Sequence, residues 1–181
     1  MRPQLMTSSR DDYETPNEIY KIFDDVFHFS LDSAADQNNT KCDLFIDKEQ
    51  NTLTTDWKEY LLLHNAETNT VWLNPPYGAK ILLPFLKKVE EEYKKGLTIC
   101  VLTAARTDTR WFRIIWENAR YLTFIYKRIK FELNGQSIGS ATFPSVVSIF
   151  TSDRWNLWKL NSIGHLMEQQ IITPQELRTL P

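Results

Sequence analysis

The sequence predicts an α/β domain built around a mostly parallel sheet. Residues 71–73 form a bulky apolar run that suits a buried strand. A helical period follows over 81–95, with lysines and glutamates on its other face, and Gly96 ends it. The run 97–102 is the clearest buried strand in the chain. A strand, a helix and another apolar strand make a βαβ unit, so a parallel sheet is expected.

Length and composition indicate one globular domain. The chain has 181 residues, of which 42% are hydrophobic and 24% charged, which is enough for one sizeable core. Its formal net charge of −2 means that binding to nucleic acid would need a local basic patch. Cys42 and Cys100 have no metal-type spacing, so we expect a reduced, intracellular protein without a metal site.

We expect three parts in the chain. Residues 1–12 are polar and without periodicity, which predicts a flexible N-terminal arm. The folded domain is expected over 13–151, and a tail over 152–181 that packs on or extends it. The N-terminus shows no charged leader before an apolar segment, and no apolar run approaches the length of a membrane span, so we expect a soluble, unexported protein.

A first helix is expected from Thr15. This residue suits the N-cap, Pro16 the first helical position, and Glu18 completes a capping box. The apolar stripe of the helix consists of Ile19, Ile22, Phe23 and Val26. A capped amphipathic helix with no further role accounts for all of these residues.

The first strand is expected over 27–32, where Phe27, Phe29 and Leu31 alternate and Asp32 ends the strand. Small residues, including Ala34, then turn the chain away. Open α/β sheets bind ligands at the carboxyl ends of their strands, so Asp32 is a candidate ligand-binding residue. An equally good interpretation is that Asp32 ends the strand only because its side chain is solvated.

Two further acids precede the strand at 71–73. A short strand at 44–46 ends before Asp47, and the sequence assigns this acid no role. Asp56 stands beside the large ring of Trp57, shortly before a polar turn.

A rigid corner, Asn74-Pro75-Pro76-Tyr77, follows the strand at 71–73. The two prolines fix φ and remove two backbone donors, so the strand must stop there. The Asn74 side-chain oxygen and the Pro75 carbonyl are both acceptors, with the Tyr77 ring beside them. Two acceptors and a flat ring suit an amino group on a planar base. The alternative is a plain strand-ending turn, which asparagine before proline favours.

Basic residues follow the next two strands. Arg106 and Arg110 lead into a predicted helix, and Arg128 and Lys130 follow a predicted strand at 121–126. A solvated charge run explains the second pair, while its alternation with apolar residues favours a basic surface. A hairpin turn is expected over 134–140, followed by a last strand at 146–150 that gives the sheet an antiparallel edge.

The ordered set of motifs is more specific than any one of them. The motifs are Tyr13-Glu14-Thr15-Pro16, Leu31-Asp32-Ser33-Ala34-Ala35, Asp56-Trp57, Asn74-Pro75-Pro76-Tyr77-Gly78, Arg106-Thr107-Asp108-Thr109 and Arg128-Ile129-Lys130-Phe131. Over roughly residues 8–150 this set resembles the phage-type DNA adenine-N6 methyltransferase family. The resemblance implies a Rossmann-like methyltransferase fold: a mostly parallel central sheet, an antiparallel C-terminal hairpin and helices on both faces.

The resemblance also implies an activity and a cofactor site. The enzyme would transfer a methyl group from S-adenosyl-L-methionine to the N6 amino group of adenine in double-stranded DNA. Thr15 and Pro16 would lie at the methionine end of the cofactor, and Asp32 and Ala34 would belong to the first cofactor motif. Asp56 would contact the adenine of the cofactor. Most such enzymes have a glycine-rich turn after the first acid, where this chain has Ser-Ala-Ala-Asp.

By the same resemblance, Asn74, Pro75, Pro76 and Tyr77 form the catalytic motif, and Asn74 also lies beside the cofactor. The target adenine would be flipped out of the duplex to stack on Tyr77. The candidate phosphate contacts are Arg106, Arg110, Arg128 and Lys130.

Several alternatives remain open at the level of sequence. The same corner would accept an adenine of RNA, the N4 amino group of cytosine or a glutamine amide. A non-catalytic DNA-binding module without a cofactor site is a third class, motivated by the missing glycines. The resemblance implies a phage or prophage protein in the cytoplasm of a bacterial host, where restriction-modification and regulation are both compatible roles.

Overall fold

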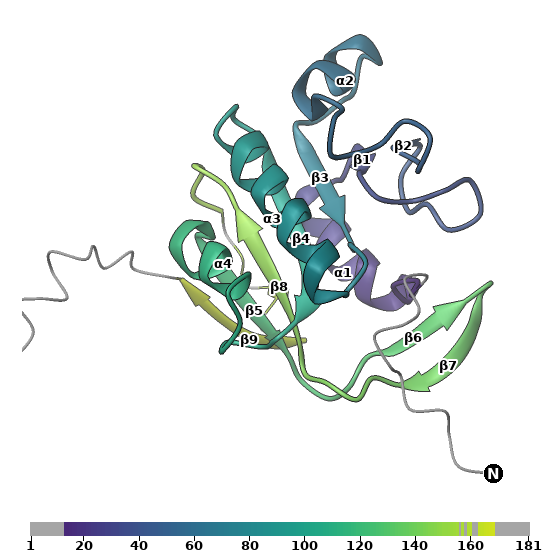
Figure 1. Cartoon of the computed structure of the whole chain (residues 1–181), viewed down its shortest axis with the longest axis vertical. Coiled ribbons are helices and arrows are strands. Elements are labelled where there is room, and N and C mark those ends of the chain that lie inside the picture. The colour runs from purple at the N-terminus through teal and green to yellow at the C-terminus, as the bar shows by residue number, and fades with distance from the viewer. Residues whose placement is uncertain (1–12, 156, 158, 161–162, 169–181) are drawn as a thin grey trace, which may run out of the picture.

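The computed structural model describes residues 13–155, 157, 159–160 and 163–168 (Figure 1). The arm expected over 1–12 and most of the tail expected over 152–181 lie outside the described residues. No helix in the described part is long and apolar enough to cross a membrane.

A seven-stranded sheet has the order β2-β1-β3-β4-β8-β5-β9. The strands are β1 (Leu31–Asp32), β2 (Leu44–Phe45), β3 (Thr70–Leu73), β4 (Thr98–Ala104), β5 (Tyr121–Ile125), β8 (Ser145–Phe150) and β9 (Gly164–Glu168). From β2 to β4 all neighbours are parallel. Strand β8 is antiparallel to both β4 and β5, and β9 is antiparallel to β5. The predicted α/β fold with a mostly parallel sheet is confirmed.

The strand expected at 146–150 is antiparallel but does not form an edge of the sheet. It is β8, which lies between β4 and β5 with all six residues buried. A strand that is buried along its whole length is stabilised by neighbours on both sides. The preceding hairpin, β6 (Lys130–Leu133) and β7 (Gln136–Ser140), forms a separate two-stranded sheet that extends away from the central one (Figure 1).

Helices cover both faces of the sheet, as the resemblance implies. They are α1 (Asn17–Phe27), α2 (Trp57–Leu63), α3 (Ala79–Tyr93) and α4 (Phe112–Asn118). Neighbouring residues of β3 point to opposite faces: Val71 and Leu73 belong to the core with α2, α3 and α4, and Trp72 to the core with α1. The helix expected over 81–95 is α3, which ends at Tyr93, two residues early; Gly96, with a φ of 91°, closes the turn that follows by donating its backbone N–H to Tyr93.

Two local predictions before β1 are wrong. Thr15 is not the N-cap of α1: the cap is Pro16, and the helix begins at Asn17. Backbone pairing of Glu14 with the hairpin keeps this segment extended up to Pro16. The strand expected over 27–32 ends at Asp32 as predicted but starts only at Leu31, because α1 continues to Phe27 before the chain reverses at His28, whose φ is 51°.

Candidate active site

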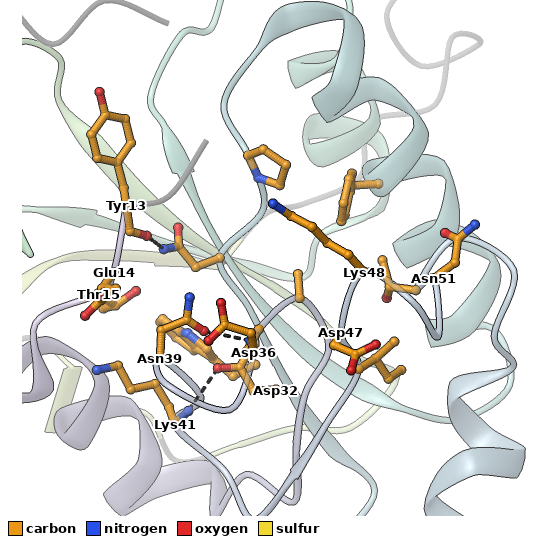
Figure 2. Close-up of a pocket in the computed structure, with 18 of the residues that line it drawn as sticks. Tyr13, Glu14, Thr15, Asp32, Asp36, Asn39, Lys41, Asp47, Lys48 and Asn51 are labelled. Atoms are coloured by element: carbon orange, nitrogen blue, oxygen red, sulfur yellow. Dashed lines mark hydrogen bonds between the residues drawn. The ribbon is translucent and has the colours of Figure 1, made fainter. Parts of the chain in front are cut away.

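A cavity of about 520 Å³ lies at the carboxyl ends of β1, β2 and β3 (Figure 2). Its walls come from the segment before α1, the turns after β1 and β2, the corner after β3 and the first turns of α3. This is the edge at which open α/β sheets bind ligands, and the volume is that of a typical small-molecule site, roughly 300–1,000 Å³.

Asp32 is the most unusual residue of the cavity wall. Only 4% of it is exposed, and its Oδ2 accepts the backbone N–H of Lys41 at 3.1 Å. Burial raises the pKa of Asp32 from 3.8 to about 6, although hydrogen bonds from the backbone of Lys41 and Ala34 oppose the shift. The other oxygen, Oδ1, has no hydrogen-bond partner within the described structure. A buried carboxylate with a vacant oxygen is suited to a ligand that carries positive charge.

Three other buried polar atoms on the cavity wall also lack a hydrogen-bond partner. They are Thr15 Oγ1, Thr52 Oγ1 and Trp72 Nε1, for which the described residues provide no partner. Buried polar groups in proteins are almost always hydrogen-bonded, so four unpartnered atoms around one cavity indicate a ligand with complementary groups. No motif marks Trp72, which is predicted from sequence only as a bulky residue of a buried strand.

The turn after Asp32 lines the cavity without any glycine. Within the described backbone, residues 33–36 have no positive φ, so alanine and serine are accommodated without strain. Ser33 donates its backbone N–H to Trp72 and Ala35 donates to Ile46, which holds the turn between β3 and β2. Ala34 also lines the cavity, as predicted for a residue beside the cofactor, whereas Pro16 is buried and is not part of its wall.

Asp47, to which the sequence assigned no role, lines the same cavity. It directly follows Ile46, next to the carboxyl end of β2, and Figure 2 shows it on the turn beside that of Asp32. Its Oδ1 accepts the backbone N–H groups of Glu49 at 2.9 Å and Gln50 at 2.8 Å. The signal that would have found Asp47 is an acid at the end of a strand that pairs with β1.

Asp56 lies outside the cavity wall. It caps α2 by accepting the backbone N–H of Glu59 at 2.9 Å, and it forms an ion pair of 2.9 Å with Lys95. These contacts lower its pKa, first the cap and then the lysine. The next residue, Trp57, is fully buried and donates Nε1 to the Thr52 carbonyl, which fixes the acid at the start of the helix. The structure therefore does not bring Asp56 together with Asp32.

The Asn74 side chain is oriented by a hydrogen bond at each end of its amide. Nδ2 donates to the Tyr13 carbonyl at 2.6 Å, and Oδ1 accepts the Tyr77 hydroxyl at 2.8 Å. Because a carbonyl can only accept, the nitrogen must face Tyr13 and the oxygen must face the other way. A carbonyl oxygen has two lone pairs, so Oδ1 can accept a second hydrogen bond. Asn74 and Pro76 line the cavity, and the buried Pro75 fixes the corner behind them.

The Tyr77 ring packs in an aromatic cluster with Tyr13, Phe131 and Phe143, at centroid distances of 6.4, 5.9 and 5.5 Å. Burial raises the pKa of its hydroxyl well above the usual value, so the group stays protonated and remains a donor to Asn74. Phe143, which carries no motif, was missed by the sequence. The cluster joins the corner to the hairpin strand β6.

All four predicted phosphate contacts are exposed. The Arg106 guanidinium lies 5.9 Å from the centroid of the Phe143 ring, so this residue approaches the aromatic cluster. Arg128 and Lys130 point outward while Ile129 is buried, as the alternation predicted. Among the described residues, no group of three His, Cys, Asp or Glu side chains is placed to hold a metal ion.

Known proteins resemble this chain over most of its length. The family model for DNA N-6-adenine-methyltransferase (Dam) matches residues 2–158. A DNA N-6-adenine-methyltransferase of Haemophilus phage HP1 is 31% identical over 149 residues, which cover 79% of this chain and 80% of the relative. A second, from Escherichia phage T1, is 29% identical over 127 residues, which cover 70% of this chain and 49% of that protein. The chain belongs to the DNA N-6-adenine-methyltransferase (Dam) family.

Proposed function

We propose that this protein methylates the N6 amino group of adenine in double-stranded DNA at the Asn74–Tyr77 corner, with S-adenosyl-L-methionine held in the adjoining cavity. The observation that carries the proposal is the position of Asn74. Its side-chain amide is fixed by a hydrogen bond at each end, on the wall of a cavity that also contains a buried carboxylate with one unpartnered oxygen, Asp32 Oδ1. Membership of the family and the names of the two phage relatives support the same reaction.

The residues of the cavity fit the proposed cofactor. S-adenosyl-L-methionine has an ammonium and a sulfonium group, and the vacant Oδ1 of Asp32 is suited to one of these positive charges. Thr15 Oγ1 and Trp72 Nε1 are free to bond its polar groups. Asp47, at the end of the neighbouring strand, would accept a ribose hydroxyl, as acids do in related dinucleotide sites. Ile46 and Phe85 provide apolar wall for the adenine.

The cofactor supplies an electrophilic methyl group, and the corner makes the amine a better nucleophile. The lone pair of N6 is delocalised into the adenine ring. The free lone pair of Asn74 Oδ1 and the carbonyl of Pro75 would accept the two N6 hydrogens and favour a pyramidal nitrogen. Both contacts strengthen as positive charge develops on N6, so they stabilise the transition state more than the ground state.

The target base must leave the duplex to reach this corner. The Tyr77 ring, held by its contacts with Phe131 and Phe143, would stack on the extruded adenine. Arg106 beside the aromatic cluster, together with the exposed Arg110, Arg128 and Lys130, would hold the phosphate backbone. The chain as a whole carries a formal net charge of −2, so DNA binding would depend on this local basic patch. Because its contacts are to phosphates, binding would weaken as the salt concentration rises. The phage origin of the relatives supports a bacterial host cytoplasm as the place of the proposed reaction.

The decisive variant is Asn74→Ala. We expect methyl transfer to plasmid DNA to fall by about a thousandfold or more because both a transition-state contact and base positioning are lost. Affinity for S-adenosylhomocysteine, measured by calorimetry, should stay within about threefold, since the charged contacts of the cavity are unchanged.

Asn118→Ala is the matched control for this variant. Asn118 is also a half-buried asparagine with both ends of its amide bonded, to Ile114 and Tyr93, but it lies on α4 outside the cavity. Wild-type turnover in Asn74→Ala would contradict the proposed mechanism. Offering labelled cofactor with duplex DNA, RNA and protein then identifies the acceptor, and label in RNA or protein alone would contradict the proposed substrate.

A further inference from the structure

The segment before α1 joins the β6–β7 hairpin to the catalytic corner. Glu14 donates its backbone N–H to the carbonyl of Glu132 in β6 and accepts the Glu132 N–H in return, both at 3.0 Å. This pair adds one residue of antiparallel bridge to the edge of the hairpin. The backbone of Glu14 thus follows the position of β6.

The side chain of Glu14 binds the tip of the same hairpin. Its Oε1 accepts the backbone N–H of Asn134 at 2.8 Å, and its Oε2 accepts that of Gly135 at 3.4 Å. The two turn residues have φ values of 50° and 71°, as in the tight turns that connect short hairpins. Because both carboxylate oxygens are used, Glu14 fixes the turn as well as the strand.

The preceding residue makes the contact with the active site. The carbonyl of Tyr13 accepts Nδ2 of Asn74 at 2.6 Å, and this bond decides which end of the amide faces the substrate. Tyr13 and Glu14 share a peptide bond, so a displacement of Glu14 moves the acceptor that orients Asn74. The Tyr13 ring adds a second link, since it packs 5.7 Å from the Phe131 ring of β6.

We propose that Glu14 is a positioning residue that couples the β6–β7 hairpin to the Asn74 amide, so that a hairpin held in place by DNA keeps the amide oxygen aimed at the target amine. The inference rests on the proposed function of Asn74. It assigns Glu14 a role through Tyr13 and not a contact with the reacting atoms. Lys130 at the start of the hairpin and the nearby Arg128 are exposed. DNA phosphates that bind these two side chains would hold the hairpin in place.

Glu14 also lines the cavity, so a direct contact with the cofactor is the competing explanation. The two roles predict different losses. If Glu14 contacts the cofactor, replacing it should lower the affinity for the cofactor. If Glu14 is a positioning residue, replacing it should lower turnover. The occupied carboxylate oxygens favour the positioning role, because neither is left vacant in the way that Asp32 Oδ1 is.

The test compares Glu14→Ala, Glu14→Gln and Glu18→Gln. Glu14→Ala removes both bonds to the turn while the backbone bridge to Glu132 remains, so the chain should still fold, which circular dichroism checks. Glu14→Gln keeps one acceptor for Asn134 and should recover part of the activity. Glu18, exposed in the first turn of α1, is the control. We expect kcat for plasmid DNA to fall about tenfold in Glu14→Ala and less in Glu14→Gln, with S-adenosylhomocysteine affinity within about twofold.

A second measurement does not depend on activity. The side-chain amide signals of Asn74 in a ¹⁵N NMR spectrum are identified by their absence in Asn74→Ala, and we expect them to shift in Glu14→Ala and to stay in place in Glu18→Gln. Unchanged Asn74 signals, an unchanged kcat, or a loss confined to cofactor affinity would overturn the proposal. Should the wild-type protein fail to methylate DNA, the proposed function is contradicted, and the NMR comparison alone decides whether Glu14 orients Asn74.

Discussion

The carboxyl end of β1 and the N-terminus of α2 each present an acid that the family resemblance assigns to the cofactor, Asp32 and Asp56, and the two acids have opposite environments. Asp32 is 4% exposed, retains an unpartnered oxygen and has its pKa raised by burial. The Asp56 side chain is 41% exposed, caps a helix, pairs with Lys95 and has its pKa lowered. The fold destabilises the charged form of Asp32, whereas it stabilises the charged form of Asp56 with a helix N-terminus and a lysine.

The difference separates a carboxylate that serves binding from one that serves structure. Folding buries the charge of Asp32 without supplying a cation at Oδ1, which costs free energy. Proteins retain such a cost at sites where a bound ligand offsets it. Asp56 already has a helix N-terminus and a lysine, which are the partners that a structural acid needs. The predictions below test this division, from the largest expected effect to the smallest.

Removing the charge of Asp32 should have the largest effect. In Asp32→Asn the positive group of the cofactor would be buried without its partner, which costs about 3 kcal/mol, or roughly a hundredfold in affinity. Calorimetry with S-adenosylhomocysteine, which keeps the ammonium group, and with S-adenosylmethionine, which also has the sulfonium, measures this loss. A loss for S-adenosylmethionine alone would identify the sulfonium as the charge that Asp32 meets, and equal losses for both ligands would identify the ammonium. Affinity near the wild-type value for both would show that Asp32 is not a cofactor acid.

The same acid should make the ligand-free protein less stable as the pH rises. The pKa of Asp32 is about 6 in the folded protein against an ordinary 3.8, so the folded state binds the proton more tightly. This contribution to stability is fully present below 3.8 and is lost as the pH rises through 6. Between pH 4 and pH 7 the loss amounts to about 2 kcal/mol.

Urea unfolding of the wild type and Asp32→Asn over this pH range isolates the effect, because asparagine does not titrate. We expect the free energy of unfolding of the wild type to fall relative to the variant. If the difference in the free energy of unfolding between the two proteins does not change with pH, the folded protein does not raise the pKa of this carboxyl group.

Asp47 should rank between the two acids. Asp47→Asn keeps Oδ1 for the backbone N–H groups of Glu49 and Gln50, so the turn should remain in place. A hydrogen bond to a charged acceptor becomes one to a neutral acceptor, and we expect cofactor affinity to fall about tenfold. The checking measurement is calorimetry, with equal thermal stability as evidence of an intact turn. Unchanged affinity would remove Asp47 from the proposed ribose contact.

Parts of the site that depend on neighbouring residues alone were predictable from sequence. The corner at Asn74 was predictable because consecutive prolines after an apolar strand have few conformations. The outward Arg128 and Lys130 were predictable too, because the alternation of charged and apolar residues over 128–131 is a local property of the sequence. The turn at Gly96 follows for the same local reason.

Asp47 and Asp56 were not distinguishable in that way. Each acid lies near an apolar or aromatic run, and the strand order decides that β2 pairs with β1 and so places Asp47 on the cavity. The interior place of β8 depends on long-range pairing with β4 and β5, and the extended backbone at Glu14 depends on pairing with Glu132. Local patterns carry no information about these partners.

The smallest effect on the cofactor is expected at Asp56. Asp56→Asn preserves a good N-cap and removes only the ion pair with Lys95, which is partly exposed and therefore worth less than about 1 kcal/mol. Asp56→Ala removes the cap as well and should lower the free energy of unfolding by about 1 kcal/mol more. In both variants the affinity for S-adenosylhomocysteine should remain within about twofold, because the binding charge resides at Asp32. If Asp56→Asn weakened binding as much as Asp32→Asn does, the N-terminus of α2 would have to reach the ligand in the bound state, and an acid satisfied by Lys95 would then also be a binding acid.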